Sequence, residues 1–364
     1  MHADPAPARR TLFGGSEPLG ARSLESLALG VGSVAFVISA LVAMLAFRFG
    51  QAPIAGPGSL GEYAAVASGV AAALAVVAGR YVIRDRSTPR PVRFLEVVDV
   101  AAIAFAHAVI AVLTWTLLAV IMQKGFIGAT VFGFSVILLA GVAAAVSAYF
   151  AFFSATHLTL PLLAGILAAF LVEGVITSTL TASDVNWWKE NLSALGMNND
   201  FSSWAFNITL IVSGILVTTL ARYATQGVPT PNPKGIGRVR LCLVLIGVFL
   251  GCVGVFPVDE FFWVHNCVAS GMAVVYIVLV FRLHRWIPGL ARAFRMLGYL
   301  FVAVVVVVAV FFATGLYTLT AVELIAGLLI FSWIILFIRN AAALEADHSA
   351  PARERDAAVS AAVS

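Results

Sequence analysis

Three ionisable side chains lie inside long apolar stretches of this sequence: Glu173, His265 and Glu323. An acid or an imidazole within the hydrocarbon of a membrane is costly, so such residues commonly bind a substrate, an ion or a proton. A histidine near two carboxyl groups can exchange a proton, bind a cation or bind a polar head group. These three residues are therefore the first candidates for a functional site.

The composition of the chain predicts a membrane protein. Apolar residues make up 61% of the 364 residues and charged residues only 11%, whereas soluble proteins have about 25% charged residues. Apolar runs of 18 or more residues indicate membrane-spanning helices. The expected fold is an all-α, polytopic membrane helix bundle of about ten transmembrane helices. The expected spans are 26–48, 61–82, 98–122, 131–154, 158–180, 203–222, 239–257, 260–281, 295–315 and 318–338.

The positions of Lys and Arg predict how these helices are oriented. Basic residues concentrate in the first tail, in segments 80–97, 222–240 and 282–295, and in the last tail. Short basic loops face the cytoplasm, so both termini are expected to be cytoplasmic and the loops at 49–60, 123–130, 181–202, 257–260 and 315–318 outward. Glu173, His265 and Glu323 would then each lie roughly 8–10 Å below the outer boundary.

A shared depth allows these residues to form one outward-facing polar pocket. Asn207 and Asn266 lie near the same expected depth and complete the candidate set of Glu173, Asn207, His265, Asn266 and Glu323. The alternative is that these residues are buried, hydrogen-bonded and structural, and serve to orient the helices. The sequence leaves both interpretations open.

The segment 181–202 is a long polar and aromatic loop at the expected outer end. Loops of this length are often functional, so we expect it to form a lid over the pocket. The candidate lid residues are Asp184, Asn186, Trp187, Trp188, Glu190 and Asn191. The alternative is an interfacial aromatic belt, which the tryptophans also fit.

The sequence contains no motif for several other kinds of function. No local pair of histidines supports a metal site, no cofactor is expected, and His107, alone on an apolar helix, is interpreted as a core histidine rather than a haem ligand. The sequence has no Walker-type phosphate loop and no Gly-x-Ser-x-Gly turn. The net charge of +4 follows membrane topology and does not indicate nucleic-acid binding. A binding role is therefore favoured over an enzymatic one.

The chain is predicted to have four parts. Residues 1–25 form a cytoplasmic tail, and residues 26–156 form a four-helix accessory membrane bundle whose small residues allow close packing. Residues 157–338 form a six-helix membrane domain that holds the candidate site. Residues 339–364, rich in Ala and charge, are predicted to be a disordered cytoplasmic tail.

The six-helix part resembles a known family. Its motifs are Asn186-Trp187-Trp188, Leu192 to Gly196, Phe206-Asn207 with Ser213-Gly214, Gly254 to Pro257 with His265, and Gly315 with Glu323. These residues resemble the membrane proteins of the domain-of-unknown-function family 998, over residues 157–338. The resemblance implies a six-helix topology and these candidate residues, but no reaction. Phe-Pro followed by His and Asn is also similar to membrane proteins that aid remodelling of lipid anchors.

Three functions are compatible with these observations. The first is handling of a lipid or lipid-linked envelope component at the outer pocket, in the cytoplasmic membrane of a bacterium, with membrane lipids as partners. The second is proton- or cation-coupled transport of a small molecule, with Glu173 and Glu323 carrying the ion. The third is a non-catalytic subunit that docks a membrane protein partner through the first four helices.

Overall fold

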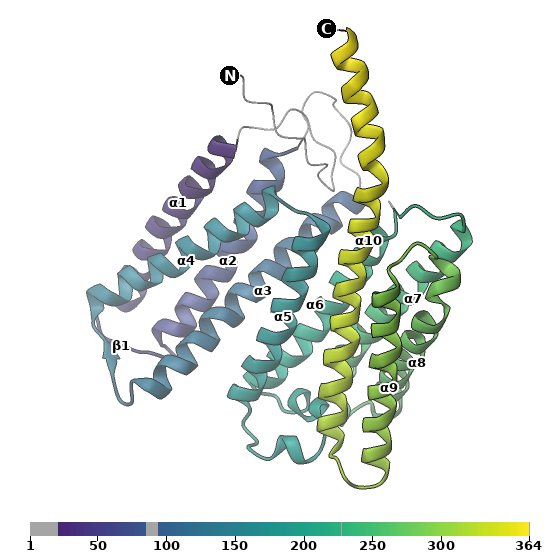
Figure 1. Cartoon of the computed structure of the whole chain (residues 1–364). Helices are drawn as coiled ribbons and strands as arrows, with labels where there is room; N and C mark the ends of the chain where they lie inside the picture. Colours follow the sequence, from purple (N-terminus) through teal and green to yellow (C-terminus); the bar gives the residue numbers. More distant parts are fainter. Residues whose placement is uncertain (1–20, 85–93, 227, 364) are drawn as a thin grey trace. The chain divides into compact units, whose positions relative to one another are not determined.

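The structure is a computed structural model that describes residues 21–84, 94–226 and 228–363. Within these residues ten helices are long and apolar enough to cross a membrane (Figure 1). The predicted fold class is therefore confirmed, and the chain is a multi-pass membrane protein. Most of the predicted tail 1–25 lies outside the described residues, and the first helix begins at Ala21.

The chain divides into two compact units, Met1–Thr159 and Leu160–Ser364, close to the division expected after residue 156. The N-terminal unit contains α1 (Ala21–Phe47), α2 (Leu60–Val82), α3 (Phe94–Gly125) and α4 (Gly133–Thr156). Two short strands, β1 (Ala52–Pro53) and β2 (Thr130–Val131), pair antiparallel between the helices. α2 packs against both α3 and α4, and α1 packs against α4.

Small side chains allow the helices of the N-terminal unit to approach closely. Ala72 and Ala144 are buried on α2 and α4. A side chain at Gly79 would meet Ala155 and the carbonyl oxygen of Phe152, so α2 and α4 touch through their backbones there. Such contacts replace the hydrophobic driving force that membrane helices lack.

The C-terminal unit is a closed ring of six helices. These are α5 (Leu160–Thr181), α6 (Phe201–Ala224), α7 (Pro233–Val255), α8 (Phe262–Trp286), α9 (Arg292–Ala313) and α10 (Leu319–Val363). Each helix packs against the next one in sequence, and α10 also packs against α5. The first and last helices of the unit are therefore neighbours in space.

Aromatic side chains fill the core of this ring. Trp333 on α10 stacks with Phe337 of the same helix and with Phe294 on α9, and the Phe294 and Phe337 rings are tilted to each other. Tyr276 on α8 makes a T-shaped contact with Trp333. Trp333, Phe337 and Tyr276 are at most 1% exposed. Bulky rings on three successive helices thus hold α8, α9 and α10 together.

The last helix is longer than the sequence predicts. The expected span ends at residue 338, and residues 339–364 are predicted to be disordered, but α10 continues as helix to Val363. The extension is rich in Ala, Glu and Arg, which favour helix even without tertiary contacts. The composition that indicates disorder here also has a high helix propensity.

Candidate functional site

The segment between α5 and α6 is folded back onto the ends of the helices. Residues 182–200, which we call the clamped loop, contain two short 3-10 turns, η1 (Trp187–Lys189) and η2 (Leu192–Gly196). The turn η2 packs on α6 and α10, and η1 packs on α10. In Figure 1 the clamped loop lies at the end of the C-terminal unit away from the C-terminus of the chain.

Asp200 holds the second end of the clamped loop and begins α6. Its carboxylate accepts hydrogen bonds from the backbone N–H of Ser203, at 2.9 Å, and from the hydroxyl of Ser183. The Ser203 hydroxyl bonds the Asp200 backbone N–H in return, which completes a capping box. Burial alone would raise the pKa of Asp200, but the bonds from Ser183 and Ser203 outweigh it and lower this pKa.

The centre of the site is a group of three side chains, Ser193, His265 and Glu323, which we call the loop-end cluster. The hydroxyl oxygen of Ser193 lies 3.0 Å from Nε2 of His265. The Glu323 carboxylate accepts a hydrogen bond from the backbone N–H of Leu192, at 2.6 Å, and another from the N–H of Ser193. Residues from α8 and α10 therefore meet at one turn of the clamped loop.

The contacts of His265 determine which ring nitrogen carries the proton. Nδ1 lies 2.7 Å from the carbonyl oxygen of Phe256. A carbonyl can only accept, so Nδ1–H donates, and in the neutral ring Nε2 accepts the hydroxyl proton of Ser193. Pro257 ends α7, and this leaves the Phe256 carbonyl outside the helical hydrogen bonds. His265 is only 4% exposed, so this orientation is enclosed by protein.

Two further side chains fasten the clamped loop to the helices. The side-chain amide of Asn207 on α6 donates to the carbonyl oxygen of Gly196 at 3.0 Å. The hydroxyl of Thr320 on α10 donates to the carbonyl oxygen of Trp188 at 2.7 Å. With His265 and Glu323, these bonds satisfy loop backbone and hydroxyl groups that would otherwise be costly to bury.

An apolar core lies beneath these polar contacts. Leu195 of η2 is buried in a cluster with Phe206 and Leu210 of α6 and Leu250 and Val253 of α7. Trp187 and Leu192 of the clamped loop pack against the same cluster. The loop is therefore packed against the helices as part of the folded unit.

Four of the six predicted lid residues lie at the surface. Asp184, Asn186, Trp188 and Glu190 are exposed, and the Asp184 carboxylate accepts the backbone N–H of Asn186 in a local turn. Asn191 is different, because its side-chain oxygen is buried and accepts no hydrogen bond from the residues that the structure describes. Of the six, only Asn191 has a buried side-chain atom that forms no hydrogen bond with the described residues.

The five predicted pocket residues do not all come together. Asn207, His265 and Glu323 all bond the clamped loop, whereas Asn266 is exposed and donates to the Phe262 carbonyl of its own helix. Glu173 lies partly buried on α5, and the contacts that join His265 to Glu323 do not include it.

Glu173 lies farther from the end of its helix than His265 and Glu323 lie from the starts of theirs. Counted along the helix axis, His265 lies about 5 Å and Glu323 about 6 Å from the starts of α8 and α10, whereas Glu173 lies about 12 Å from the end of α5. These distances are measured from the helix ends, and the shared depth below the outer membrane boundary stays a prediction. The helices α8 and α10 begin closer to these residues than the apolar runs suggest.

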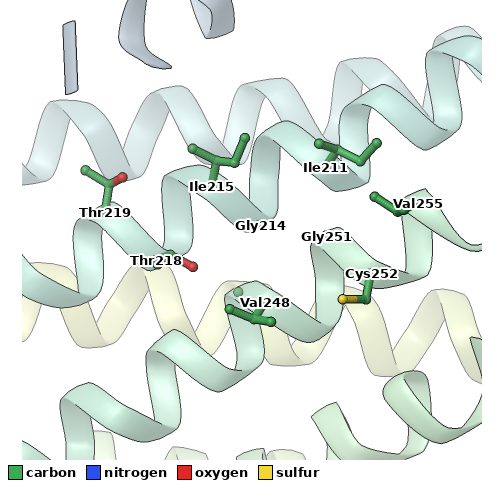
Figure 2. Close-up of a pocket in the computed structure, with 10 residues that line it drawn as sticks. Ile211, Gly214, Ile215, Thr218, Thr219, Val248, Gly251, Cys252 and Val255 are labelled. Atoms are coloured by element: carbon green, nitrogen blue, oxygen red, sulfur yellow. The ribbon is translucent and has the colours of Figure 1, made fainter. Parts of the chain in front are cut away.

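A groove runs along the outside of the C-terminal unit between α6 and α7 (Figure 2). It has a volume of about 350 Å³ and is lined by Ile211, Gly214, Ile215, Thr218, Thr219, Gly247, Val248, Gly251, Cys252 and Val255. The two helix backbones touch at Gly214 and Gly247, where a side chain on either residue would meet backbone atoms of the other helix. Because these glycines have no side chain, they form the floor of the groove. Ile215, Val248 and Val255 form its exposed walls.

One end of this groove reaches the clamped loop. Ile211 lies one helical turn after Asn207, the residue that holds Gly196. The backbone carbonyl of Asn207 also faces Gly254 of α7, one residue before Val255. The apolar groove therefore begins where the polar contacts of the loop end.

His107 has a structural role, and the described residues contain no cluster that could hold a metal ion. His107 in the N-terminal unit is bonded at both ring nitrogens, to the Ile103 carbonyl at 2.8 Å and to the Ser154 hydroxyl at 3.0 Å, as a core histidine would be. Within the described residues no group of three or more His, Cys, Asp or Glu side chains could hold a metal ion.

Sequence reasoning missed the role of Ser193. It is one of several serines in a polar segment, and nothing in its neighbours along the chain distinguishes it. Its partners His265 and Glu323 come from helices far along the sequence, so only the tertiary structure identifies it. Thr320 is not among the predicted site residues either, although its hydroxyl bonds the loop.

Comparison with known proteins supports the family assignment. Residues 162–340 match the model of the family described as "Protein of unknown function (DUF998)". The resemblance predicted from the sequence is therefore confirmed for the C-terminal part of the chain. No curated protein and no solved structure matches the chain.

Proposed function

We propose that the C-terminal unit handles a lipid or lipid-linked component of the outer leaflet of a bacterial cytoplasmic membrane. The head group would bind at the loop-end cluster and an acyl chain would lie along the groove between α6 and α7. The N-terminal unit would serve as an accessory bundle that docks a membrane protein partner. The observation that carries the proposal is the position of Asn207, which holds Gly196 of the clamped loop and lies one helical turn before Ile211 of the apolar groove.

The polar contacts of the cluster support a head-group site. The Asn191 side-chain oxygen is buried next to Leu192 and Ser193, and it accepts no bond within the described part of the chain. Leaving such an atom unbonded costs about 1–3 kcal/mol. A hydroxyl or ammonium group of a lipid head group would supply the donor, and lipid head groups commonly carry such groups.

The groove supports an acyl chain as the second part of the ligand. Ile215, Val248 and Val255 are 43%, 46% and 53% exposed on helices that span the membrane, so their neighbours are hydrocarbon. The floor is formed by glycines, at which the backbones of α6 and α7 meet without intervening side chains. The orientation that brings this end to the outer leaflet is the one that the basic loops predict.

Lipid retention tests this proposal. The full-length protein is placed in nanodiscs of phosphatidylethanolamine and phosphatidylglycerol, released, and analysed by native mass spectrometry. We expect the wild type to retain lipid, and His265→Ala, Glu323→Ala and Ile215→Trp to lose most of it. Asn266→Ala, next to His265 but outside the cluster, and Leu300→Trp, on the exposed face of α9, should retain it.

Two results would overturn the proposal. One is a wild type that retains no lipid under conditions in which it stays folded. The other is equal retention by the site variants and by the Asn266→Ala and Leu300→Trp controls. In that case the loop-end cluster would only hold the clamped loop in place.

A further inference from the structure

The contact between Ser193 and His265 has the geometry of a catalytic pair as well as that of a structural hydrogen bond. We infer that Ser193 is a nucleophile and His265 its general base, and that the pair cleaves or transfers the acyl group of a lipid ester. This inference rests on the proposed function, because that function brings the ester to the loop-end cluster. It adds a reaction to a site otherwise proposed only to bind.

The first argument is the geometry of the pair. A serine hydroxyl becomes a good nucleophile when a base lies within about 2.6–3.2 Å and a third group orients that base. Here Oγ of Ser193 and Nε2 of His265 are 3.0 Å apart. The Phe256 carbonyl, 2.7 Å from Nδ1, fixes the tautomer in which Nε2 can take the proton. The third group is thus a backbone carbonyl instead of a carboxylate.

The second argument is how the two partners are exposed. His265 is 4% exposed, so it is held in place and shielded from water. Ser193 is only partly buried, on a turn at the end of the unit, so a substrate can approach its hydroxyl. A fixed base beside a reachable nucleophile is the arrangement that acyl transfer requires.

The third argument concerns the negative charge that forms on the ester oxygen. The backbone N–H groups of Leu192 and Ser193 both bond the Glu323 carboxylate, so two donors beside Ser193 point toward one oxygen-bearing group. Paired N–H groups of this kind stabilise a tetrahedral oxyanion. An ester carbonyl that displaced the Glu323 oxygen would receive the same two bonds.

The location of the pair selects the class of substrate. His265 lies about 5 Å inside the start of α8, near the end of a helix that is long and apolar enough to cross a membrane. Ester groups that join acyl chains to a lipid head group lie at the edge of the hydrocarbon core. With an acyl chain in the groove between α6 and α7, the substrate would be an acyl ester of a membrane lipid.

The reaction is balanced by water or by an acceptor alcohol. The Ser193 oxygen bonds the ester carbonyl carbon while its proton passes to Nε2 of His265. The intermediate collapses, the bond to the lipid alcohol breaks, and His265 returns the proton to that alcohol. Water, or a second hydroxyl-bearing molecule, then attacks the acyl-Ser193 ester with His265 as base, and releases a fatty acid or a new ester.

A serine-directed probe tests the pair directly. The full-length protein in the same nanodiscs is treated with a long-chain alkyl fluorophosphonate. Its phosphorus bonds the Ser193 oxygen, fluoride leaves, and His265 takes the proton. We expect mass spectrometry to locate the label on Ser193. His265→Ala lacks the base, so its labelling should be slower by about 100-fold or more. Ser193→Ala should carry no label at position 193.

A conservative variant separates catalysis from support of the loop. His265→Gln keeps a side chain that can bond Ser193 but has no base, so it should retain its thermal stability and still label slowly. Asn266→Ala should label like the wild type. Labelling of His265→Gln at the wild-type rate, or a stable wild type with no label on Ser193, would overturn the inference.

The outcome also distinguishes this inference from the proposed function. A protein that retains lipid in the nanodisc assay but is not labelled at Ser193 binds the lipid without this chemistry. A protein that retains no lipid fails the proposed function first, whatever its labelling. Labelling at Ser193 without lipid retention would assign a reactive serine whose substrate is not a tightly held lipid.

Discussion

Ser193 and His265 are separated by 72 residues in the chain, yet their side chains lie 3.0 Å apart, Oγ to Nε2. The serine is on a turn of the clamped loop and the histidine is on α8. Whatever binds at this end of the unit therefore meets loop and helix together.

Glu323 should stabilise the clamped loop through its two backbone bonds. We expect Glu323→Ala to destabilise the loop by about 1–3 kcal/mol, because the N–H groups of Leu192 and Ser193 lose their acceptor. Hydrogen exchange measured by mass spectrometry should become faster in residues 187–196. Glu190→Ala, in the same loop but exposed, is the matched control. Equal exchange in both variants would show that the Glu323 bonds contribute little.

Asp200 should make the start of α6 sensitive to acid. Its folded-state pKa lies below the ordinary value, so its stabilisation is complete above that value, about 3.9, and is lost as the pH falls through the lower folded pKa. At pH 7 we expect Asp200→Ala to cost about 1 kcal/mol. Hydrogen exchange of the first turn of α6, followed from pH 7 to pH 3, measures the effect.

The comparison variant for this prediction is Asp200→Asn. Asparagine also caps helices well but does not titrate. Its difference from the wild type should therefore begin to shrink as the pH falls below about 4. The difference should disappear below the lower folded pKa, where the wild-type carboxylate is protonated in the folded protein. A difference that is constant across this range would contradict an ionised cap.

Gly214 should tolerate no side chain. A methyl group there would meet the Gly247 carbonyl and the Gly251 backbone N–H, so Gly214→Ala must push α6 away from α7. We expect a loss of about 1–3 kcal/mol in the free energy of unfolding. Gly237→Ala on α7 meets open space and should stabilise by about 1 kcal/mol because alanine favours helix. Thermal unfolding in detergent would show opposite shifts.

The Tyr276 hydroxyl should contribute nothing to stability. It is buried against Trp333, and it has no hydrogen-bond partner within the described residues. We expect Tyr276→Phe to be neutral or stabilising by up to about 1–3 kcal/mol, since it removes a buried group without a partner. Tyr63→Phe, which loses a 2.8 Å bond to the Ser39 carbonyl, should instead destabilise by about 1 kcal/mol. Denaturation of the two variants in parallel compares them.

The helices could be predicted from the sequence because each is long, apolar and bounded by polar or helix-breaking residues. Pro257, which follows the end of α7, and Asp200, which caps α6, are local signals of this kind. The end of α10 could not be predicted in this way, because an Ala- and charge-rich segment fits both a helix and a disordered tail.

The candidate site was predicted only in part because depth along a helix says nothing about direction around it. Asn266 follows His265 directly and so points to a different side of α8, where it is exposed. Glu173 lies on the correct helix ring but at a different distance from the helix end. Ser193 could not be selected, because it is placed by packing of Leu195 and Trp187 against α6 and α7.

The ring of six helices closes only when α10 meets α5, and this has a consequence for assembly in the membrane. The clamped loop is made before α8 and α10, which carry His265 and Glu323. During synthesis the loop must wait, with its backbone groups in contact with water or lipid, until the last helix is inserted. The site is therefore complete only at the end of biogenesis, and a chain that stops before α10 leaves the backbone N–H of Leu192 without its Glu323 acceptor.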